Sequence, residues 1–507
     1  MLNLTAAARP YFSLLRRRRA AYADAAGLER VQRSLLERLL FRARRTEIIR
    51  EAKLSPAATY RDFADAIPVV EYEDIRPRVM RMLHGEPDVL WPGITRRYAQ
   101  SSGTSGGKSK YIPVTDHSLS QNHYPGAAQA VATYLGQRPR GSRLFGGSSL
   151  ILGGSFANEV ADLPSGVLVG DLSAHLIDCI NPAVNLFRVP DKDTALMPDW
   201  ERKLPALVDA AAKADITNIS GVPSWFLMVL RRVLERTGAS TIHEVWPNLE
   251  VFFHGGIAFG PYREQYAAIT DPSKMHYVET YNASEGFFAV QDTPDSADGM
   301  LLLARDGVFY EFIPVDDTAA RPVPSWEVEK GRTYALVITA CNGLWRYLPG
   351  DTLRIECTEP LRVSIAGRLG AFINAFGEEL MVWNADAAIS RACAAARARI
   401  ADYTAAPVYA AAGTRGRHQW LVEWETPPAD IPAFTRELDK ALQEVNSDYQ
   451  AKRAGGIFLD APEVISLPRG TFSQWLAATG KLGGQRKVPR LANNRRIADA
   501  ILEMIQN

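Results

Sequence analysis

The segment SSGTSGGKSK, residues 101–110, lies between two short runs, TRRYAQ and YIPVT, in which polar and apolar residues mix. Its ten residues include three glycines, five hydroxyl side chains and two lysines. Backbone N–H groups, hydroxyls and cations presented at close range bind an anion such as phosphate. The flanking runs each predict a short strand. The sequence therefore predicts a phosphate-binding loop between two strands.

This loop resembles a Walker A loop only at its end. Gly107, Lys108 and Ser109 match the end of the G-x-x-x-x-G-K-[ST] pattern, but its first glycine falls on Ser102, and Gly103 comes one position late. Each glycine of such a loop serves one tight backbone position, so a shift of one residue matters. We therefore interpret the segment as a phosphate loop of another kind, which disfavours a P-loop kinase.

The bulk properties of the chain exclude several classes of protein. At 507 residues the chain is too long for one ordinary core, and two to four structural units are expected. Its 58 Lys and Arg residues against 57 Asp and Glu disfavour a dedicated nucleic-acid binder. No apolar run reaches the roughly 18 residues of a membrane span. The four cysteines form no C-x-x-C pair, which predicts neither a disulfide framework nor a zinc site and favours the cytoplasm.

The order of the predicted elements indicates an α/β fold. Residues 214–238 predict a strand, a turn at Pro223 and a helix, and residues 249–256 and 274–286 predict strands that end in small-residue loops. After about residue 380, a helix over 384–406, a strand over 416–425 and a helix over 434–453 predict a small α+β unit. We place the domain boundary near residues 374–380, which divides the chain into domains of residues 1–376 and 377–507.

Three further motifs carry candidate chemistry. In YNASEG, residues 281–286, Glu285 follows an apolar strand and is a natural Mg²⁺ ligand beside a phosphate loop, or an exposed turn residue. In WRYLPGD, residues 345–351, a Pro-Gly turn projects Asp351, which either binds ribose hydroxyls or caps the next segment. In GQRKVPRL, residues 484–491, Lys487 either projects from a loop or belongs to a solvated basic tail.

Taken together and in order, these motifs resemble one family. SSGTSGGKSK, HGG (254–256), YNASEG, YLPGD and QRKVPR occur as in the acyl acid amido synthetases of the Gretchen Hagen auxin-responsive family, and PVVEYEDIRPRV, GVPSW (221–225) and GTF (470–472) also match. The likeness covers nearly the whole chain. These enzymes belong to the adenylate-forming superfamily, with acyl-CoA ligases and luciferase. The resemblance implies a large N-terminal adenylation domain with mixed sheets and a small mobile α+β C-terminal domain.

The resemblance also implies a reaction and its residues. A carboxylic acid attacks the α-phosphate of ATP, pyrophosphate leaves, and an amine or amino acid then takes the acyl group. Lys487 would meet the α-phosphate, Glu285 would hold Mg²⁺, and Asp351 would hold the ribose. The implied nucleotide contacts are Ser101, Ser102, Gly103, Thr104, Ser105, Lys110, Gly255, Gly256, Tyr281, Asn282, Ala283, Ser284 and Asp351. The implied acyl-site residues are Val222, Trp225, Phe226 and His254.

Two departures from the family pattern concern the substrates. Arg486 stands where the family has a tyrosine before the lysine, and the chain is shorter than typical plant members. An acyl-CoA ligase, with a thiol acceptor, is the alternative enzyme. A non-catalytic nucleotide-binding regulator is the alternative from another class, and the intact Glu285, Asp351 and Lys487 oppose it. We expect a monomer that binds small molecules and no nucleic acid.

Overall fold

The computed structural model describes residues 3–101, 110–138, 141–156, 158, 160, 162–256, 259–293, 298–317, 320–369, 372–373, 375, 378, 380–409, 416–446, 449–450, 453, 459–479 and 487–506. The chain forms two compact units. Unit 1 comprises Met1–Ile257 and Ala267–Ser364, and unit 2 comprises Ala258–Tyr266 and Ile365–Asn507. The domain boundary between residues 376 and 377 stays a prediction.

A sheet of 12 described strands forms the centre of unit 1, in the order β12-β11-β13-β14-β15-β10-β9-β8-β7-β6-β3-β5. Strands β8, β7, β6, β3 and β5 are parallel neighbours, whereas β8–β9, β9–β10 and β10–β15 are antiparallel. This mixed sheet confirms the predicted α/β class. The strands are β3 (Ser148–Ile151), β5 (Arg188–Val189), β6 (Ile216–Gly221), β7 (Val251–Gly255), β8 (His276–Ala283), β9 (Gly286–Val290), β10 (Met300–Leu302), β11 (Val308–Pro314), β12 (Val323–Pro324), β13 (Thr333–Ala340), β14 (Asp351–Thr358) and β15 (Leu361–Arg368).

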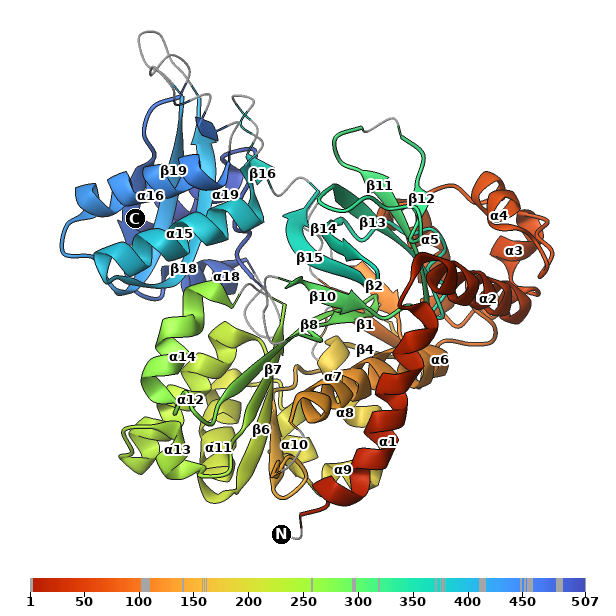
Figure 1. Cartoon of the computed structure of the whole chain (residues 1–507), viewed down its shortest axis with the longest axis horizontal. Coiled ribbons are helices and arrows are strands. Elements are labelled where there is room, and N and C mark those ends of the chain that lie inside the picture. The colour runs from red at the N-terminus through yellow and green to blue at the C-terminus, as the bar shows by residue number, and fades with distance from the viewer. Residues whose placement is uncertain are drawn as a thin grey trace. The chain divides into compact units, whose positions relative to one another are not determined.

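Helices cover both faces of the parallel strands. Successive side chains of a strand point to opposite faces, and the two phenylalanines of β7 demonstrate it. The Phe252 ring lies 5.2 Å from Phe226 of α12 (Pro223–Thr237). The Phe253 ring lies 6.1 Å from Tyr134 of α7 (Tyr124–Gln137), and Figure 1 shows these two helices beside the strands. Burial on both faces explains why β7 is buried along its whole length.

The N-terminal part of unit 1 confirms the strands predicted on either side of residues 101–110. Strand β1 (Arg97–Ser101) pairs with β2 (Lys110–Pro113) and with β4 (Leu168–Gly170), so strands do flank residues 101–110. In α2 (Ala25–Ala43), the leucines at positions 28, 35, 36, 39 and 40 recur at helical spacing and are buried. The other helices of this unit are α1 (Thr5–Arg17), η1 (Arg18–Tyr22), α3 (Glu47–Glu51), α4 (Tyr60–Ala66), α5 (Tyr72–Leu83), α6 (Asp116–Ser118), η2 (Leu119–His123), α8 (Leu172–Cys179), α9 (Pro182–Asn185), α10 (Lys192–Leu196), α11 (Trp200–Lys213) and α13 (Ile242–Val245).

Unit 2 is an α+β unit whose three-stranded sheet has the order β18-β19-β20. Trp420 of β19 packs on the side of α15 and α16, and the next residue, Leu421, packs on the side of α18 and α19. Its elements are η3 (Gly260–Tyr262), α14 (Arg263–Ile269, which continues into unit 1), β16 (Phe372–Ile373), β17 (Leu380–Met381), α15 (Val382–Ala396), β18 (Arg399–Val408), β19 (Arg417–Thr426), α16 (Ile431–Val445), β20 (Glu463–Leu467), α18 (Thr471–Ala478) and α19 (Arg496–Gln506).

The helix predicted over residues 384–406 is wrong in its second half. α15 ends at Ala396, Arg397 takes a left-handed conformation with φ of 52°, and β18 begins at Arg399. Ile400, Tyr403 and Ala405 of β18 are buried in the core of unit 2. Alanine favours a helix locally, but antiparallel pairing with β19 and this burial outweigh that preference. The small unit therefore has more strands than the predicted helix–strand–helix order.

Candidate active site

The carboxyl ends of β6, β7 and β8 bring three of the sequence motifs side by side. Gly221, the last residue of β6, pairs with His254 of β7, and Gly255 pairs with Thr280 of β8. Gly255 allows β7 to approach closely, because a Cβ there would lie 2.2 Å from the Thr280 carbonyl oxygen. In open α/β sheets ligands bind at the carboxyl ends of the strands. Residues 221–225, 254–256 and 281–286 therefore share the edge where a ligand is expected.

Tyr281 and Asp351 join two motifs that lie 70 residues apart. The Tyr281 hydroxyl donates a hydrogen bond of 2.5 Å to Asp351 Oδ2. Asp351 begins β14 directly after Gly350, whose φ of 96° forms the predicted turn. Tyr281 is 5% exposed, and its ring lies 4.9 Å from that of Phe288. The pair places a carboxylate and a phenol together at the end of β8.

Lys110, at the end of the predicted phosphate loop, contacts Tyr347 of the WRYLPGD motif, which also contains Asp351. Ser101 and Lys110 pair across β1 and β2, so the two ends of the loop are held together. Lys110 Nζ donates to the Tyr347 hydroxyl at 3.4 Å and lies 5.8 and 6.0 Å from the ring centroids of Tyr72 and Tyr347. Burial raises the pKa of Tyr72 to about 12. Ser102, Gly103, Thr104 and Ser105 lie outside the described residues.

The YNASEG motif forms the turn from β8 to β9. Asn282 and Ala283 end β8 half-buried, Ser284 is half-buried in the turn, and Glu285 is 6% exposed. The Glu285 carbonyl accepts a hydrogen bond of 3.2 Å from Asn342 Nδ2, which fixes the backbone of this turn. Glu285 is therefore a buried carboxylate, not an exposed turn residue. Among the described residues, no group of three or more His, Cys, Asp or Glu side chains is arranged to hold a metal.

The residues expected at the acyl site lie at the start of α12 and the end of β7. Val222 precedes α12, and half-buried Trp225 lies edge-on to Trp200 with centroids 4.9 Å apart. Phe226 is fully buried against β7. His254 is buried too, and its carbonyl accepts a 3.0 Å hydrogen bond from Thr280 Oγ1. Gly256 follows with a φ of 84°. The roles of these residues stay predictions.

Models of one family match most of the chain. The GH3 family N-terminal, central and C-terminal domain models match residues 19–204, 301–368 and 383–496, respectively. The chain belongs to the GH3 family.

Full-length GH3 relatives are distant in sequence but cover most of the chain. "Probable indole-3-acetic acid-amido synthetase GH3.1" of Arabidopsis thaliana is 23% identical over 542 residues, covering 91% of this chain and 89% of that protein. "Indole-3-acetic acid-amido synthetase GH3.8" of Oryza sativa subsp. indica is 23% identical over 541 residues, covering 91% and 88%. The identity is spread over nearly the whole of each chain, as the ordered motifs predicted.

Solved structures share the fold. "AtGH3.15 acyl acid amido synthetase in complex with 2,4-DB" has a TM-score of 0.77 at 19% identity, covering 97% of this chain and 95% of that one. A 2-hydroxyisobutyryl-CoA ligase in the postadenylation state has a TM-score of 0.59 at 15% identity, covering 96% and 94%. The chain thus has the fold of adenylate-forming ligases. As a GH3 protein, it is an AMP-forming acid–amine ligase. No helix in the described part of the chain is long and apolar enough to cross a membrane.

Sequence reasoning missed two residues, Arg346 and Asn122, that hold parts of the candidate site in place. Arg346, inside the WRYLPGD motif, is buried against Glu311. Asn122 accepts from the Phe287 N–H at 2.7 Å and donates to the Phe287 carbonyl at 2.9 Å, which anchors β9 next to Glu285. A charged residue between two apolar ones was a usable signal for Arg346. Nothing in the sequence around Asn122 distinguishes it.

Lys487 belongs to unit 2, whereas Lys110, Tyr281, Glu285 and Asp351 belong to unit 1. It is exposed, and the next residue, Val488, is buried in a small core with Phe472. Its catalytic role stays a prediction.

Proposed function

We propose that this ligase binds ATP at the carboxyl ends of β6, β7 and β8. The observation that carries the proposal is the hydrogen bond from Tyr281 to Asp351. It joins the YNASEG and WRYLPGD motifs, and Lys110 lies against Tyr347, which belongs to the same motif as Asp351. In this arrangement Asp351 accepts hydrogen bonds from the ribose hydroxyls, Tyr281 stacks on the adenine, and Lys110 closes the phosphate loop as a cation.

The first half-reaction forms an acyl-adenylate. An oxygen of the substrate carboxylate attacks the α-phosphorus, and the bond to pyrophosphate breaks. Negative charge gathers on the phosphate oxygens, so positioned cations such as Lys110 and Lys487 stabilise the transition state. In the second half-reaction an amine nitrogen attacks the carbonyl carbon, AMP leaves, and the amine loses a proton. No side chain of the enzyme becomes a covalent intermediate.

Glu285 fits a Mg²⁺ ion that is held mainly by the nucleotide. Mg²⁺ typically uses one or two carboxylates together with phosphate oxygens and water. A single buried carboxylate on a turn that Asn342 fixes matches that donor set better than a cluster of protein ligands does. Bound there, the ion would neutralise phosphate charge. Glu285→Ala is expected to raise the Mg²⁺ concentration needed for half-maximal activity.

We propose an acid with an apolar body as the acyl substrate. Trp225 and Trp200 are half-buried and in contact. Trp225 lies in the first turn of α12, and Trp200 begins α11. Aromatic surface left partly exposed beside polar groups is typical of small-molecule sites. The relatives' names cite indole-3-acetic acid, an aromatic acid of this class. An amino acid is the proposed acceptor.

Acid-dependent exchange of pyrophosphate into ATP tests the adenylation step. A panel of aryl and alkyl carboxylic acids is supplied to the folded protein, with and without an amino-acid mixture. We expect exchange with at least one apolar acid, release of AMP and pyrophosphate, and an amide product by mass. Coenzyme A serves as the acceptor control. If no acid of the panel supports exchange, or if ADP is released, the proposal is contradicted.

Tyr281→Phe tests the hydrogen bond between Tyr281 and Asp351, which carries the proposal of an ATP site. The variant keeps the ring and removes the hydrogen bond to Asp351. Loss of one such bond costs about 1 kcal/mol, so the KM for ATP should rise about fivefold with little change in kcat. Tyr334→Phe is the control. Tyr334 is a buried tyrosine on β13, and among its described contacts its hydroxyl accepts only from the Glu329 N–H. An unchanged KM in Tyr281→Phe removes this pair from the nucleotide site.

A further inference from the structure

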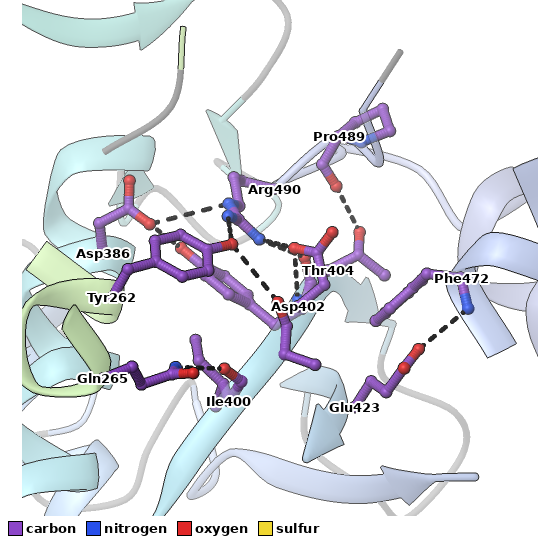
Figure 2. Close-up of polar contacts among 12 residues, drawn as sticks. Tyr262, Gln265, Asp386, Ile400, Asp402, Thr404, Glu423, Phe472, Pro489 and Arg490 are labelled. Carbon is purple, nitrogen blue, oxygen red and sulfur yellow. Dashed lines mark hydrogen bonds and ion pairs between the residues drawn. The ribbon is translucent and has the colours of Figure 1, made fainter. Parts of the chain in front are cut away.

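One carboxylate holds the start of helix α18 in unit 2. Helix α18 begins after Gly470, whose φ of 88° is left-handed. The backbone N–H groups of Gly470 and Phe472 donate to the two oxygens of Glu423, at 2.6 and 3.1 Å. Carboxylates are favourable at helix N-termini, where N–H groups lack helical partners. Glu423 of β19 thus ties the beginning of α18 to the sheet of unit 2 (Figure 2).

An arginine, Arg490, holds the part of the chain that directly follows Lys487. The Arg490 guanidinium is bonded to Asp402 of β18, and its charge also lies 3.9 Å from Asp386 of α15. It stacks over the Tyr403 ring at 4.5 Å. Arg490 is 12% exposed. Being nearly buried and paired with two carboxylates, this cation is held firmly, because removing a partner would leave charge buried without compensation.

Backbone hydrogen bonds continue the attachment to β18. Thr404 Oγ1 donates to the Pro489 carbonyl at 2.6 Å, and the Ala405 N–H donates to the Arg490 carbonyl at 2.8 Å. The Ala492 N–H donates back to the Ala405 carbonyl at 3.0 Å. Residues 489–492 therefore run along β18 like an added strand. Lys487 lies two residues before this attachment begins.

The segment Ala258–Tyr266 supports the arginine. Arg490 Nη2 donates to the Tyr262 hydroxyl at 3.4 Å, and that hydroxyl lies 3.4 Å from the Ala401 carbonyl. Gln265 Nε2 donates to the Ile400 carbonyl at 3.0 Å. This short segment, which follows the HGG motif in the chain, packs with unit 2 and completes the surroundings of Arg490 (Figure 2).

Asp402 and Glu423 are direct partners in the register of β18 and β19. Two like charges placed opposite each other destabilise a sheet. Here each carboxylate is compensated separately: Asp402 by Arg490, and Glu423 by the N–H groups at the start of α18.

We propose that Asp402 and Arg490 form a clamp that positions Lys487 for adenylation. Asp402 acts through Arg490, three residues after Lys487, so it is a positioning residue. The inference rests on the proposed role of Lys487. It predicts that breaking the clamp leaves Lys487 less well positioned, which impairs the step that needs its charge.

Half-reaction kinetics of Asp402→Asn test the clamp. Misplacing a catalytic group by about 1 Å costs roughly 100-fold, so the rate of acid-dependent pyrophosphate exchange should fall 10- to 100-fold. The KM for ATP should change less than about twofold, because ground-state binding does not use Lys487. Aminolysis of a supplied acyl-adenylate should keep most of its rate. Equal loss in both half-reactions overturns the proposal.

Double variants with Lys487→Ala separate positioning from general stability. If the clamp acts through Lys487, then Asp402→Asn should add less than about a twofold loss once the lysine is absent, because residues that act as a unit are not additive. If instead the losses from Asp402→Asn and Lys487→Ala multiply in the double variant, the proposal is overturned. If Lys487→Ala alone is silent while acid-dependent exchange persists, the clamp is overturned together with the lysine's role, but the ligase assignment stands.

A matched ion pair in the same unit provides the control. Arg453 Nη2 lies 2.7 Å from Asp439 Oδ2, with exposures of 17% and 13%, and this pair has no described contact with residues 487–492. Asp439→Asn should leave the exchange rate of the folded fraction unchanged. Should Asp402→Asn fail to fold, Thr404→Val removes only the bond to Pro489 and should lower exchange by about fivefold, the worth of one hydrogen bond. Equal exchange rates in Thr404→Val and the parent chain overturn the clamp.

Discussion

Arg346 is a buried cation whose three nitrogen atoms all have acceptors. Nη2 and Nε donate to the two oxygens of Glu311 at 2.8 and 3.0 Å, and Nη1 donates to the carbonyls of Ala64 and Ile67 at 2.7 Å each. Burial raises the pKa of Glu311, and the arginine beside it opposes that rise. Because Arg346 lies five residues before Asp351, this pair holds the entry to the turn that is proposed to bind ribose.

Removing the arginine should destabilise unit 1 strongly. Arg346→Met leaves the Glu311 carboxylate buried without its partner, which typically costs about 3–5 kcal/mol. Urea unfolding followed by tryptophan fluorescence measures the loss. Arg332→Met, which breaks an exposed pair with Asp316, should leave the unfolding midpoint almost unchanged. If Arg346→Met unfolds at the same urea concentration as the parent chain, the pair does not stabilise the fold.

The buried Asp306 carboxyl should make the free energy of unfolding depend on pH, and its raised pKa sets the direction of the change. Burial raises its pKa to about 6 from 3.8, and Arg19 and Arg305 oppose that rise. A carboxyl whose pKa is raised on folding favours the folded state below the unfolded pKa and loses that effect as pH rises through the folded one. The free energy of unfolding, parent minus Asp306→Asn, should therefore fall by up to about 3 kcal/mol between pH 4 and 7. Urea unfolding of both proteins at a series of pH values measures the difference; a flat difference contradicts the assignment.

At the scale of elements, the close approach of β7 and β8 decides where the motifs meet. The Gly255 position leaves no room for a side chain, because a Cβ would approach the Thr280 carbonyl oxygen to 2.2 Å. Thr280 directly precedes Tyr281, so any separation of these strands displaces the partner of Asp351. Helices α12 and α7, packed on the two faces of β7, limit how far the strands can yield.

Gly255→Ala should therefore disturb both stability and nucleotide binding. Overpacking of a tight site costs about 1–3 kcal/mol, and here the clash is with backbone, which cannot rotate away. We expect a lower melting temperature and a higher KM for ATP. Gly260→Ala is the control, since its Cβ would lie 3.5 Å from Ser390 Oγ, an ordinary contact. A Gly255→Ala variant with normal stability and KM would contradict the close approach.

At the scale of the whole molecule, the proposed adenylation machinery is divided between two units. Tyr281, Glu285 and Asp351 lie in unit 1, and Lys487 lies in unit 2. A lid-type movement that brings a catalytic group in for one step and removes it for the next is a common way to run two reactions at one site. We propose that the C-terminal unit moves in this way between adenylation and amide formation.

Lys487→Ala should separate the two half-reactions. A cation that meets the α-phosphate as charge develops acts in the transition state more than in ATP binding. Pyrophosphate exchange should fall about 100-fold or more, by analogy with the loss of one preorganised donor, while ATP affinity changes little. Aminolysis of a supplied acyl-adenylate should survive better. Lys481→Ala, outside the described residues, is the control expected to be neutral; a damaging Lys481 change with a silent Lys487 change would contradict the motif assignment.

Much of the fold was predictable from local pattern. Hydrophobic periodicity and the positions of glycine and proline, which act within a few residues, predict three features of the fold. These are the strands on either side of residues 101–110, the helix that begins at Pro223, and strand β19. The failure over residues 399–406 has the same physical origin. Alanine there favours a helix locally, and only β19, which is distant in sequence, makes the strand more favourable.

The sequence by itself determined which chemistry-bearing residues the chain carries and in which order, and so its family and class of reaction. Only the tertiary structure decided which of them meet. The bond between Tyr281 and Asp351, the place of Lys110 against Tyr347, and the two attachments on either side of Lys487 all join residues far apart in the chain. Such contacts form because strands pair and burial forces polar groups to find partners, and neither is a property of a short stretch of sequence.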